Sequence, residues 1–160
     1  MREQQVPTQF DLRSGKWGYE ITNDLDPIKW FKLLLLRPED ILRDEIRDSD
    51  HLSHARAQLA EPGAPNPTQV VAAYLKKLWR HTLAQLRTRV VLDSWPLRVG
   101  ITVPAIWPHY AHSAMREAAR LAGITAERDI GLTTLDLIQE PEAAALSILF
   151  ERGGKPEIQA

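Results

Sequence analysis

Two short segments of the chain place chemically capable residues where a strand would give way to a helix. They are Val103-Pro104-Ala105 and Gln139-Glu140-Pro141. In open α/β sheets, ligands bind beyond the carboxyl ends of the strands, where such loops gather. A glutamate at the second junction could hold a hydrated magnesium ion or orient a water molecule. A simpler role for Glu140 is also open, because a carboxylate there would stabilise the positive end of the following helix.

Other residues with chemical potential have simpler explanations. The histidine pairs His51/His54 and His109/His112 have helical spacing, but neither pair has a third ligand nearby, so surface or packing roles are expected. Lys32 lies in an apolar segment, from which it could reach an anion, but the favoured expectation is that its stem lies along apolar surface. No P-loop, G-x-G-x-x-G, nucleophile elbow or H-E-x-x-H motif is present in the sequence.

The clearest helix signal in the chain begins at Asn66. Asn66 is a good N-cap, Pro67 suits the first helical position, and Gln69 can complete a capping box. We expect one continuous helix to about Arg87, with a single apolar face. That face would be formed by Val71, Tyr74, Leu75, Leu78, Leu83 and Leu86.

The elements that would position the two junctions follow this helix. Residues 97–103 are predicted to form a strand buried on both faces, because they are apolar and β-branched with little alternation. A helix at 109–122, a short strand at 135–138 and an Ala-rich helix at 141–153 come next. This order predicts a right-handed crossover unit in a largely parallel sheet.

The first third of the chain contains short apolar segments separated by turns and charges. Residues 6–10 and 16–21 suit a hairpin. A short helix is expected at 27–36, since proline is tolerated in a first helical turn. Residues 37–66 alternate in charge and end in a Pro/Gly run, which indicates a solvated helix followed by a loop. The buried stripe of the short helix would contain Trp30, Leu33 and Leu34.

Composition restricts the class of protein. The 160 residues are 44% hydrophobic and 26% charged, as expected for one globular domain. With 20 basic and 21 acidic residues, no nucleic-acid surface is expected, and the absence of cysteine excludes disulfides and thiol catalysis. No apolar run approaches the roughly 20 residues of a membrane helix, and no signal peptide is visible. We therefore expect a cytoplasmic protein without a nucleic-acid or membrane partner.

Several segments together resemble a known family. The run V-G-I-T-V-P-A-I-W-P-H-Y-A-H-S-A-M-R-E-A-A-R-L-A-G-I, followed by L-D-L-I-Q-E-P-E-A-A-A-L, resembles the nucleotide-binding domain of the seventy-kilodalton heat-shock chaperones. That family has a strand ending in V-P-A, a helix ending in A-G and an N-E-P-x-A-A-A segment. N-P-T-Q-V-V-A-A-Y-L-K-K-L resembles its preceding helix. V-P-T, G-K-W-G-Y-E and W-F-K-L-L-L resemble its early strands and next helix, in a divergent, chaperone-like branch.

The resemblance implies a fold and a division of the chain. The fold would be α/β, a partial actin-like (ribonuclease-H-like) ATPase domain with a mixed sheet and crossover helices. Residues 1–36 would supply early strands and a short helix, and 37–66 a charged insert and Pro/Gly linker. Residues 67–160 would supply a helix and the strand–helix–strand–helix part, with the domain incomplete at both ends.

The resemblance also implies a site. Glu140 matches the family's catalytic glutamate, which faces the magnesium–phosphate site and helps to arrange the attacking water. Pro104 matches the proline that switches when nucleotide binding is relayed to a partner domain. ATP and magnesium are the implied cofactors. Two positions depart from the family, because its relay arginine falls on His112 and its N-E-P asparagine on Gln139.

The family's two phosphate-binding turns are expected to lie outside this chain. The segment Asp129-Ile130-Gly131-Leu132-Thr133-Thr134 resembles the first of them, but it lies where the family has only a connection. We therefore expect a fragment of a chaperone-like ATPase domain, inactive on its own. The parent function would be ATP binding and hydrolysis coupled to conformational change, with nucleotide and clients or co-chaperones as partners. The alternative is a non-catalytic fragment or pseudo-ATPase that acts as a protein-interaction module.

Overall fold

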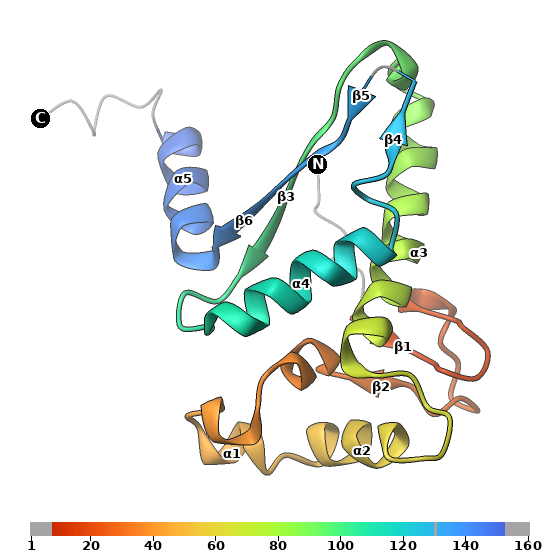
Figure 1. The fold of residues 1–160 in the computed structure, drawn as a ribbon, viewed down its shortest axis with the longest axis vertical. Coiled ribbons are helices and arrows are strands. Elements are labelled where there is room, and N and C mark those ends of the chain that lie inside the picture. Colours follow the sequence, from red (N-terminus) through yellow and green to blue (C-terminus); the bar gives the residue numbers. More distant parts are fainter. Residues whose placement is uncertain (1–7, 130, 153–160) are drawn as a thin grey trace, which may run out of the picture.

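A computed structural model describes residues 8–129 and 131–152 and shows an α/β arrangement (Figure 1). Within these residues the strands form three two-stranded sheets, β1–β2, β3–β6 and β4–β5. Helices α3 and α4 pack against each other between the N-terminal part and the β3–β6 sheet. The chain is therefore built from small sheets held by helices. Its actin-like character stays a prediction.

The N-terminal hairpin forms only in part. β1 (Gln9–Phe10) pairs antiparallel with β2 (Ile28–Lys29), and Phe10 makes only an isolated bridge to Trp17. A 3-10 helix, η1 (Gly18–Glu20), replaces the strand predicted at 16–21. The expectation is wrong there because Gly18 takes a positive φ of 55° and turns the chain out of the extended conformation. Val6 and Pro7 lie outside the described residues.

The short helix predicted at 27–36 is also wrong in its start and its buried face. Its first residues are extended in β2, and a 3-10 helix, η2 (Phe31–Leu35), begins only after Trp30. Ile28, Phe31 and Leu35 are buried, whereas Trp30 is 44% exposed. The reason is tertiary, because pairing of Ile28 with Phe10 holds this segment in a sheet and delays the helix.

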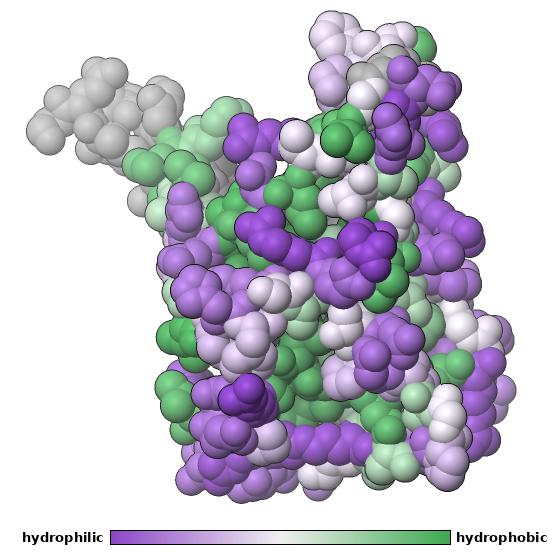
Figure 2. All heavy atoms as spheres, in the orientation of Figure 1, coloured by the Kyte–Doolittle hydropathy of each residue, from purple (hydrophilic) through white to green (hydrophobic). Residues whose placement is uncertain are grey.

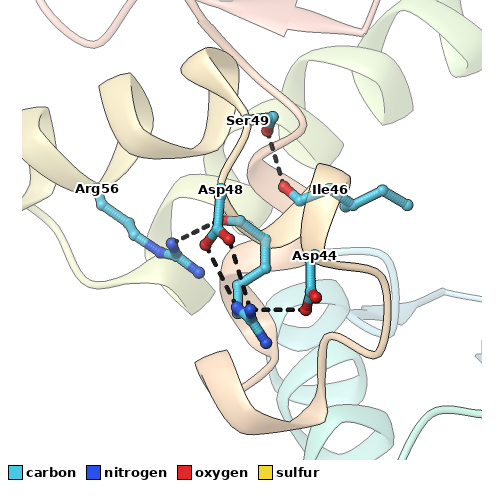
Figure 3. A network of polar contacts seen from close by, with 6 residues as sticks. Asp44, Ile46, Asp48, Ser49 and Arg56 are labelled. Carbon is cyan, nitrogen blue, oxygen red and sulfur yellow. Dashed lines mark hydrogen bonds and ion pairs between the residues drawn. The ribbon is translucent and has the colours of Figure 1, made fainter.

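The charged segment 37–66 contains three short helices and a local group of ion pairs. It contains η3 (Pro38–Asp40), α1 (Asp44–Arg47) and α2 (Asp50–Leu59). Figure 3 shows the α1–α2 connection, where Arg47 binds the carboxylates of Asp44 and Asp48 and Ser49 donates to a backbone carbonyl. The predicted helix exists, but it is not solvated all round, because Leu52 and Ala55 are fully buried. α2 packs against β2 and η2.

The helix predicted from Asn66 is confirmed. α3 (Pro67–Arg87) is continuous and starts with a complete capping box. The Asn66 side chain accepts a hydrogen bond from the Gln69 backbone at 2.9 Å, and the Gln69 side chain accepts one from the Asn66 backbone at 2.9 Å. Its N-terminal half enters the core through four residues, namely Val70, Val71, Ala72 and Tyr74.

The crossover unit is confirmed as a parallel pair. β3 (Arg98–Val103) leads through α4 (His109–Leu121) to β6 (Thr134–Gln139), and Arg98 to Val103 pair in register with Thr134 to Gln139. α5 (Glu140–Arg152) follows directly. The expectation that β3 is buried on both faces is wrong. Alternate residues Arg98, Gly100 and Thr102 are exposed, because α3 and α4 cover only one face in the described part of the chain.

Smaller elements complete the C-terminal half. η4 (Leu92–Ser94) connects α3 to β3, and the antiparallel pair β4 (Glu127–Arg128) and β5 (Gly131–Leu132) connects α4 to β6. Gly123 ends α4 with a φ of 80°, the left-handed conformation that glycine adopts without strain. Among the described helices, none is long and apolar enough to cross a membrane.

Candidate functional site

The two junctions lie together at one edge of the β3–β6 sheet. Val103 pairs with Gln139, so the next residue of each strand, Pro104 and Glu140, leaves the sheet at the same end. Parallel pairing of the two strands thus brings both junctions to one edge of the sheet, where ligands of open α/β sheets bind. A cavity of about 380 Å³ opens between them. Its lining residues are Thr8, Trp30, Lys32, Leu33, Ile46, Pro104 and Glu140.

An ion pair between Lys32 and Glu140 spans this cavity. The Lys32 Nζ lies 2.7 Å from the Glu140 Oε1, and the two side chains are 33% and 47% exposed. The same ammonium approaches the backbone carbonyl of Thr102 at 3.5 Å and lies 5.3 Å from the centre of the Trp107 ring. The lysine is thus held by a carboxylate, a carbonyl and an aromatic face.

Sequence reasoning missed the contact of Lys32 with Glu140. It considered that Lys32 could reach an anion but favoured a lysine whose stem lies along apolar surface, whereas the structure places the ammonium 2.7 Å from the Glu140 carboxylate. The position follows from local geometry, because Lys32 is the second residue of η2, which packs against α3 and α4. The available signal was one cation inside the apolar run Trp30–Leu36. Trp107 is buried at 5% exposure and supplies the ring beneath the ammonium.

Both roles considered for Glu140 are compatible with its position. It is the first residue of α5, where its negative charge is favoured by the helix dipole. Its Oε1 simultaneously binds Lys32. Helix stabilisation and a place in the cavity therefore do not exclude each other.

The two positions that depart from the family motif do not line the cavity. His112 lies on α4, half-buried, with its ring 6.2 Å from that of His109. Its Nε2 has no hydrogen-bond partner in the described part of the chain. Gln139 is the last residue of β6 and is exposed.

The segment that resembles a phosphate loop lies at the other end of β6. Asp129 follows β4 in a turn, Gly131 is the first residue of β5, and Ile130 lies outside the described residues. The six-residue strand β6 then separates this hairpin from Glu140 (Figure 1). At roughly 3.3 Å per residue, the two ends of such a strand are about 20 Å apart. The structure therefore does not bring this segment to the cavity.

The two histidines of the first pair, His51 and His54, contact different partners. His54 Nε2 lies 3.0 Å from the carboxylate of Asp26, and the ring of His51 contacts that of Trp30 at 5.3 Å. Neither points to metal binding. Over residues 8–129 and 131–152, no group of three His, Asp or Glu side chains is arranged to hold a metal ion.

Sequence comparison gives one informative relative. The chain is 34% identical over 95 residues to a chaperone protein HscA homolog of Colwellia psychrerythraea. Part of this chain is related to a chaperone. The aligned stretch covers 59% of this chain and only 13% of the relative, so the chain spans a small part of that protein's length. No protein-family model and no solved structure matches the chain.

Among the described residues, the cavity has one cationic and one anionic side chain, and their chemistry can be compared with what a magnesium nucleotide requires. Lys32 offers a positive charge for a phosphate oxygen, and Glu140 offers an acceptor for a water molecule. A single carboxylate that already binds an ammonium is a poor metal site by itself, since magnesium is usually held through waters and substrate phosphates as well. The donor set therefore suits magnesium only together with its water and phosphate ligands. Glu140 as the metal-facing residue stays a prediction.

Proposed function

We propose that this chain is part of an ATP-binding and ATP-hydrolysing domain with an actin-like fold, related to the seventy-kilodalton heat-shock chaperones. The observation that carries the proposal is the contact of Lys32 with Glu140 beside Pro104, at the carboxyl ends of two parallel strands. Ligand sites of open α/β sheets lie at such ends. The 34% identity to a chaperone over 95 residues supports the same origin.

In the proposed mechanism each side chain has a separate task. Magnesium-ATP, when bound, supplies the phosphoryl group that is transferred to water. Lys32 would contact a phosphate oxygen and offset the repulsion between that phosphate and Glu140. Glu140 would then accept a hydrogen bond from the attacking water and orient it. Pro104 would fix the backbone where β3 leaves the sheet, because its ring restricts φ.

The proposal places the protein in the cytoplasm and gives it clients or co-chaperones as partners. It requires two glycine-containing turns that would cradle phosphates with backbone N–H groups. The coding DNA on both sides of the segment is therefore the first test. In-frame D-x-G-T-T upstream and D-x-G-G-G-T downstream are expected.

The second test is ATP turnover of that longer protein. Glu140→Gln should slow hydrolysis about 100-fold or more, because it removes the group that orients water, while nucleotide affinity changes less than about tenfold. Glu142→Gln, on the same turn of α5 and outside the cavity, is the matched control and should keep normal turnover. Unchanged hydrolysis in the Glu140→Gln protein would remove Glu140 from the mechanism.

A second candidate function is a non-catalytic or pseudo-ATPase fragment that acts as a protein-interaction module. It is favoured by α5, whose Leu146, Leu149 and Phe150 are 57%, 56% and 91% exposed. Apolar side chains this exposed are typical of contact surfaces when they cluster. Flanking DNA without either glycine-containing turn, and a longer protein without ATP turnover, would favour this function over the first.

A further inference from the structure

The charge of the chain is unevenly distributed along its sequence. From Pro62 to Leu92 there is no acidic residue, although the whole chain has 21 acidic and 20 basic residues. The same stretch contains basic residues only, namely Lys76, Lys77, Arg80, Arg87 and Arg89. A nearly neutral protein therefore carries one strongly positive segment, and most of that segment is α3.

The structure arranges three of these cations in a line. Lys76, Arg80 and Arg87 are exposed and are spaced by four and seven residues, so they lie on the same side of α3. We call these three residues the basic row. With a rise of 1.5 Å per residue, it extends over about 17 Å. The side of α3 that Val70, Val71 and Tyr74 occupy is buried, so the row lies on the solvent side of the helix.

The basic row differs from several other cations of the described chain in its lack of acidic partners there. Arg47, Arg98 and Arg120 each bind an aspartate or glutamate at 2.6 to 2.7 Å. No residue of the row forms an ion pair with an acidic residue in the described part of the chain. In Figure 2, hydrophilic residues line the margin of the molecule over α3, at the right. The row is therefore available to charges from outside.

Apolar residues adjoin the C-terminal end of the row. Val90 and Val91 follow α3 and are 50% and 71% exposed. With Arg87 and Arg89 they line an open cavity of about 440 Å³. Positive charge and apolar surface are thus contiguous at this end of the helix.

We propose that the basic row and the adjoining valines form a docking surface for an acidic protein segment that also carries apolar side chains. Its carboxylates would lie along Lys76, Arg80 and Arg87. Its apolar side chains would cover Val90 and Val91. The charge complementarity supplies the orientation, and burial of the valines supplies contact area that charge alone does not give.

A polyphosphate fits the same surface less well. Val90 and Val91 offer nothing to a phosphate backbone. The rest of the chain is acidic, since all 21 acidic residues lie outside 62–92, and it would repel a long polyanion. The partner with carboxylates and apolar groups is therefore the one that uses the whole surface.

The test uses the 160-residue chain and fluorescence anisotropy of a short labelled peptide made of glutamate and leucine. Reversing the charge of the basic row in K76E/R80E/R87E should weaken binding of the peptide at least about tenfold. The reason is that each exposed charge contact contributes some tenths of a kcal/mol to about 1 kcal/mol. The matched control R13E/K29E/R43E reverses three exposed cations elsewhere and should change affinity less than about twofold. Val91→Ser should weaken binding of this peptide but not of one with serine in place of leucine.

Circular dichroism of both triple variants checks the fold, and the single variant Arg87→Glu replaces the triple variant if the latter does not fold. Equal affinities for the reversal and control variants would contradict the proposal, as would no binding of the wild-type chain to the peptide. Tighter binding to duplex DNA or to phosphatidylserine vesicles than to the peptide would assign the surface to those partners instead. Sedimentation that shows self-association lost only in the reversal variant would assign it to a second copy of the chain.

Discussion

At the scale of single residues, the ion pair between Lys32 and Glu140 lines a cavity and is expected to contribute little to the stability of the fold. It joins residues 108 positions apart at 2.7 Å, yet both side chains are partly open to solvent. Ion pairs of this kind typically contribute about 0 to 1 kcal/mol, because water and salt screen them. The pair can therefore exchange partners with a ligand at little cost to stability.

A double-mutant cycle tests that conclusion. Lys32→Met and Glu140→Gln, alone and combined, should give a coupling free energy below about 1 kcal/mol in urea unfolding. The exposed pair of Arg98 with Asp136 is the comparison, and its coupling should be similarly small. A coupling above about 3 kcal/mol for Lys32 and Glu140 would mean that the pair is a structural bridge.

A second residue-scale prediction concerns Asp11, which closes the turn after β1. Asp11 is 4% exposed and accepts hydrogen bonds from the Ser14 backbone at 2.7 Å and the Ser14 hydroxyl at 2.5 Å. Burial alone would raise the pKa of Asp11, but these hydrogen bonds and the charge of Arg13 lower it overall. Asp11→Ala should destabilise the protein by about 1–2 kcal/mol at neutral pH.

The lowered pKa of Asp11 fixes the sign of its pH dependence. A group with a lower pKa in the folded state stabilises the protein fully above its unfolded pKa of about 3.9. That contribution is lost as the pH falls through the folded pKa. Urea unfolding should therefore show the gap between wild type and Asp11→Ala narrowing in acid. A gap that stays constant as the pH falls through this range would contradict the assignment.

At the scale of elements, the sequence predicts what each segment encodes in itself and misses what a distant segment imposes. α3 is predictable because Asn66, Pro67 and Gln69 cap it with their own side chains and backbone. The segment 27–36 is not, because pairing of Ile28 with Phe10 is decided by a strand outside it. In β3, exposed and less exposed residues alternate, but two of the exposed positions are Gly100 and Thr102, which are not strongly polar. The sequence therefore does not show the polar–apolar alternation that indicates an exposed face.

The residues of the candidate site also differ in how far the sequence predicts their positions. Glu140 and Pro104 are predictable as neighbours, because a parallel pair must present both strand ends at one edge. That Lys32 could reach an anion is visible in the sequence, but its partner is not predictable, since Glu140 lies 108 residues away and the direction of the lysine depends on how η2 packs against α3 and α4. Short-range periodicity contains no information on that packing.

The element-scale prediction is that the Asn66 N-cap of α3 contributes to the free energy of unfolding of the protein. Asn66→Ala removes the acceptor for the Gln69 backbone and should cost about 1 kcal/mol of unfolding free energy. Asn23→Ala, at an exposed loop position, is the control and should change stability by less than about 0.5 kcal/mol. Equal effects of the two substitutions in urea unfolding would show that α3 does not depend on its cap.

At the scale of the whole molecule, apolar surface is left uncovered at α5. Apolar residues come to the surface there, at the upper left of Figure 2, and Phe150 is 91% exposed. Together with the uncovered face of β3, this predicts that the isolated chain self-associates.

Substitutions on α5 test this prediction by sedimentation at several concentrations. Leu149→Lys with Phe150→Lys should lower the average mass toward that of a monomer, because it removes apolar surface and adds charge. Ala144→Lys with Ser147→Lys adds the same charge at exposed positions of the same helix and should have the smaller effect. A wild-type chain that stays monomeric at every concentration would overturn the prediction.

The last whole-molecule prediction concerns nucleotide binding by the 160-residue chain itself. Its cavity offers one ammonium and one carboxylate, whereas tight phosphate binding needs several backbone N–H donors in glycine-containing turns. Among the residues that the structure describes, no glycine lines this cavity. Calorimetric titration of a monodisperse sample with magnesium-ATP should therefore give a dissociation constant weaker than about 1 mM and no turnover. A low-micromolar constant that is lost on Asp129→Ala would show that the β4–β5 hairpin contacts phosphate after all. The same affinity lost on Lys32→Ala and kept on Asp129→Ala would show that the cavity binds ATP without further turns.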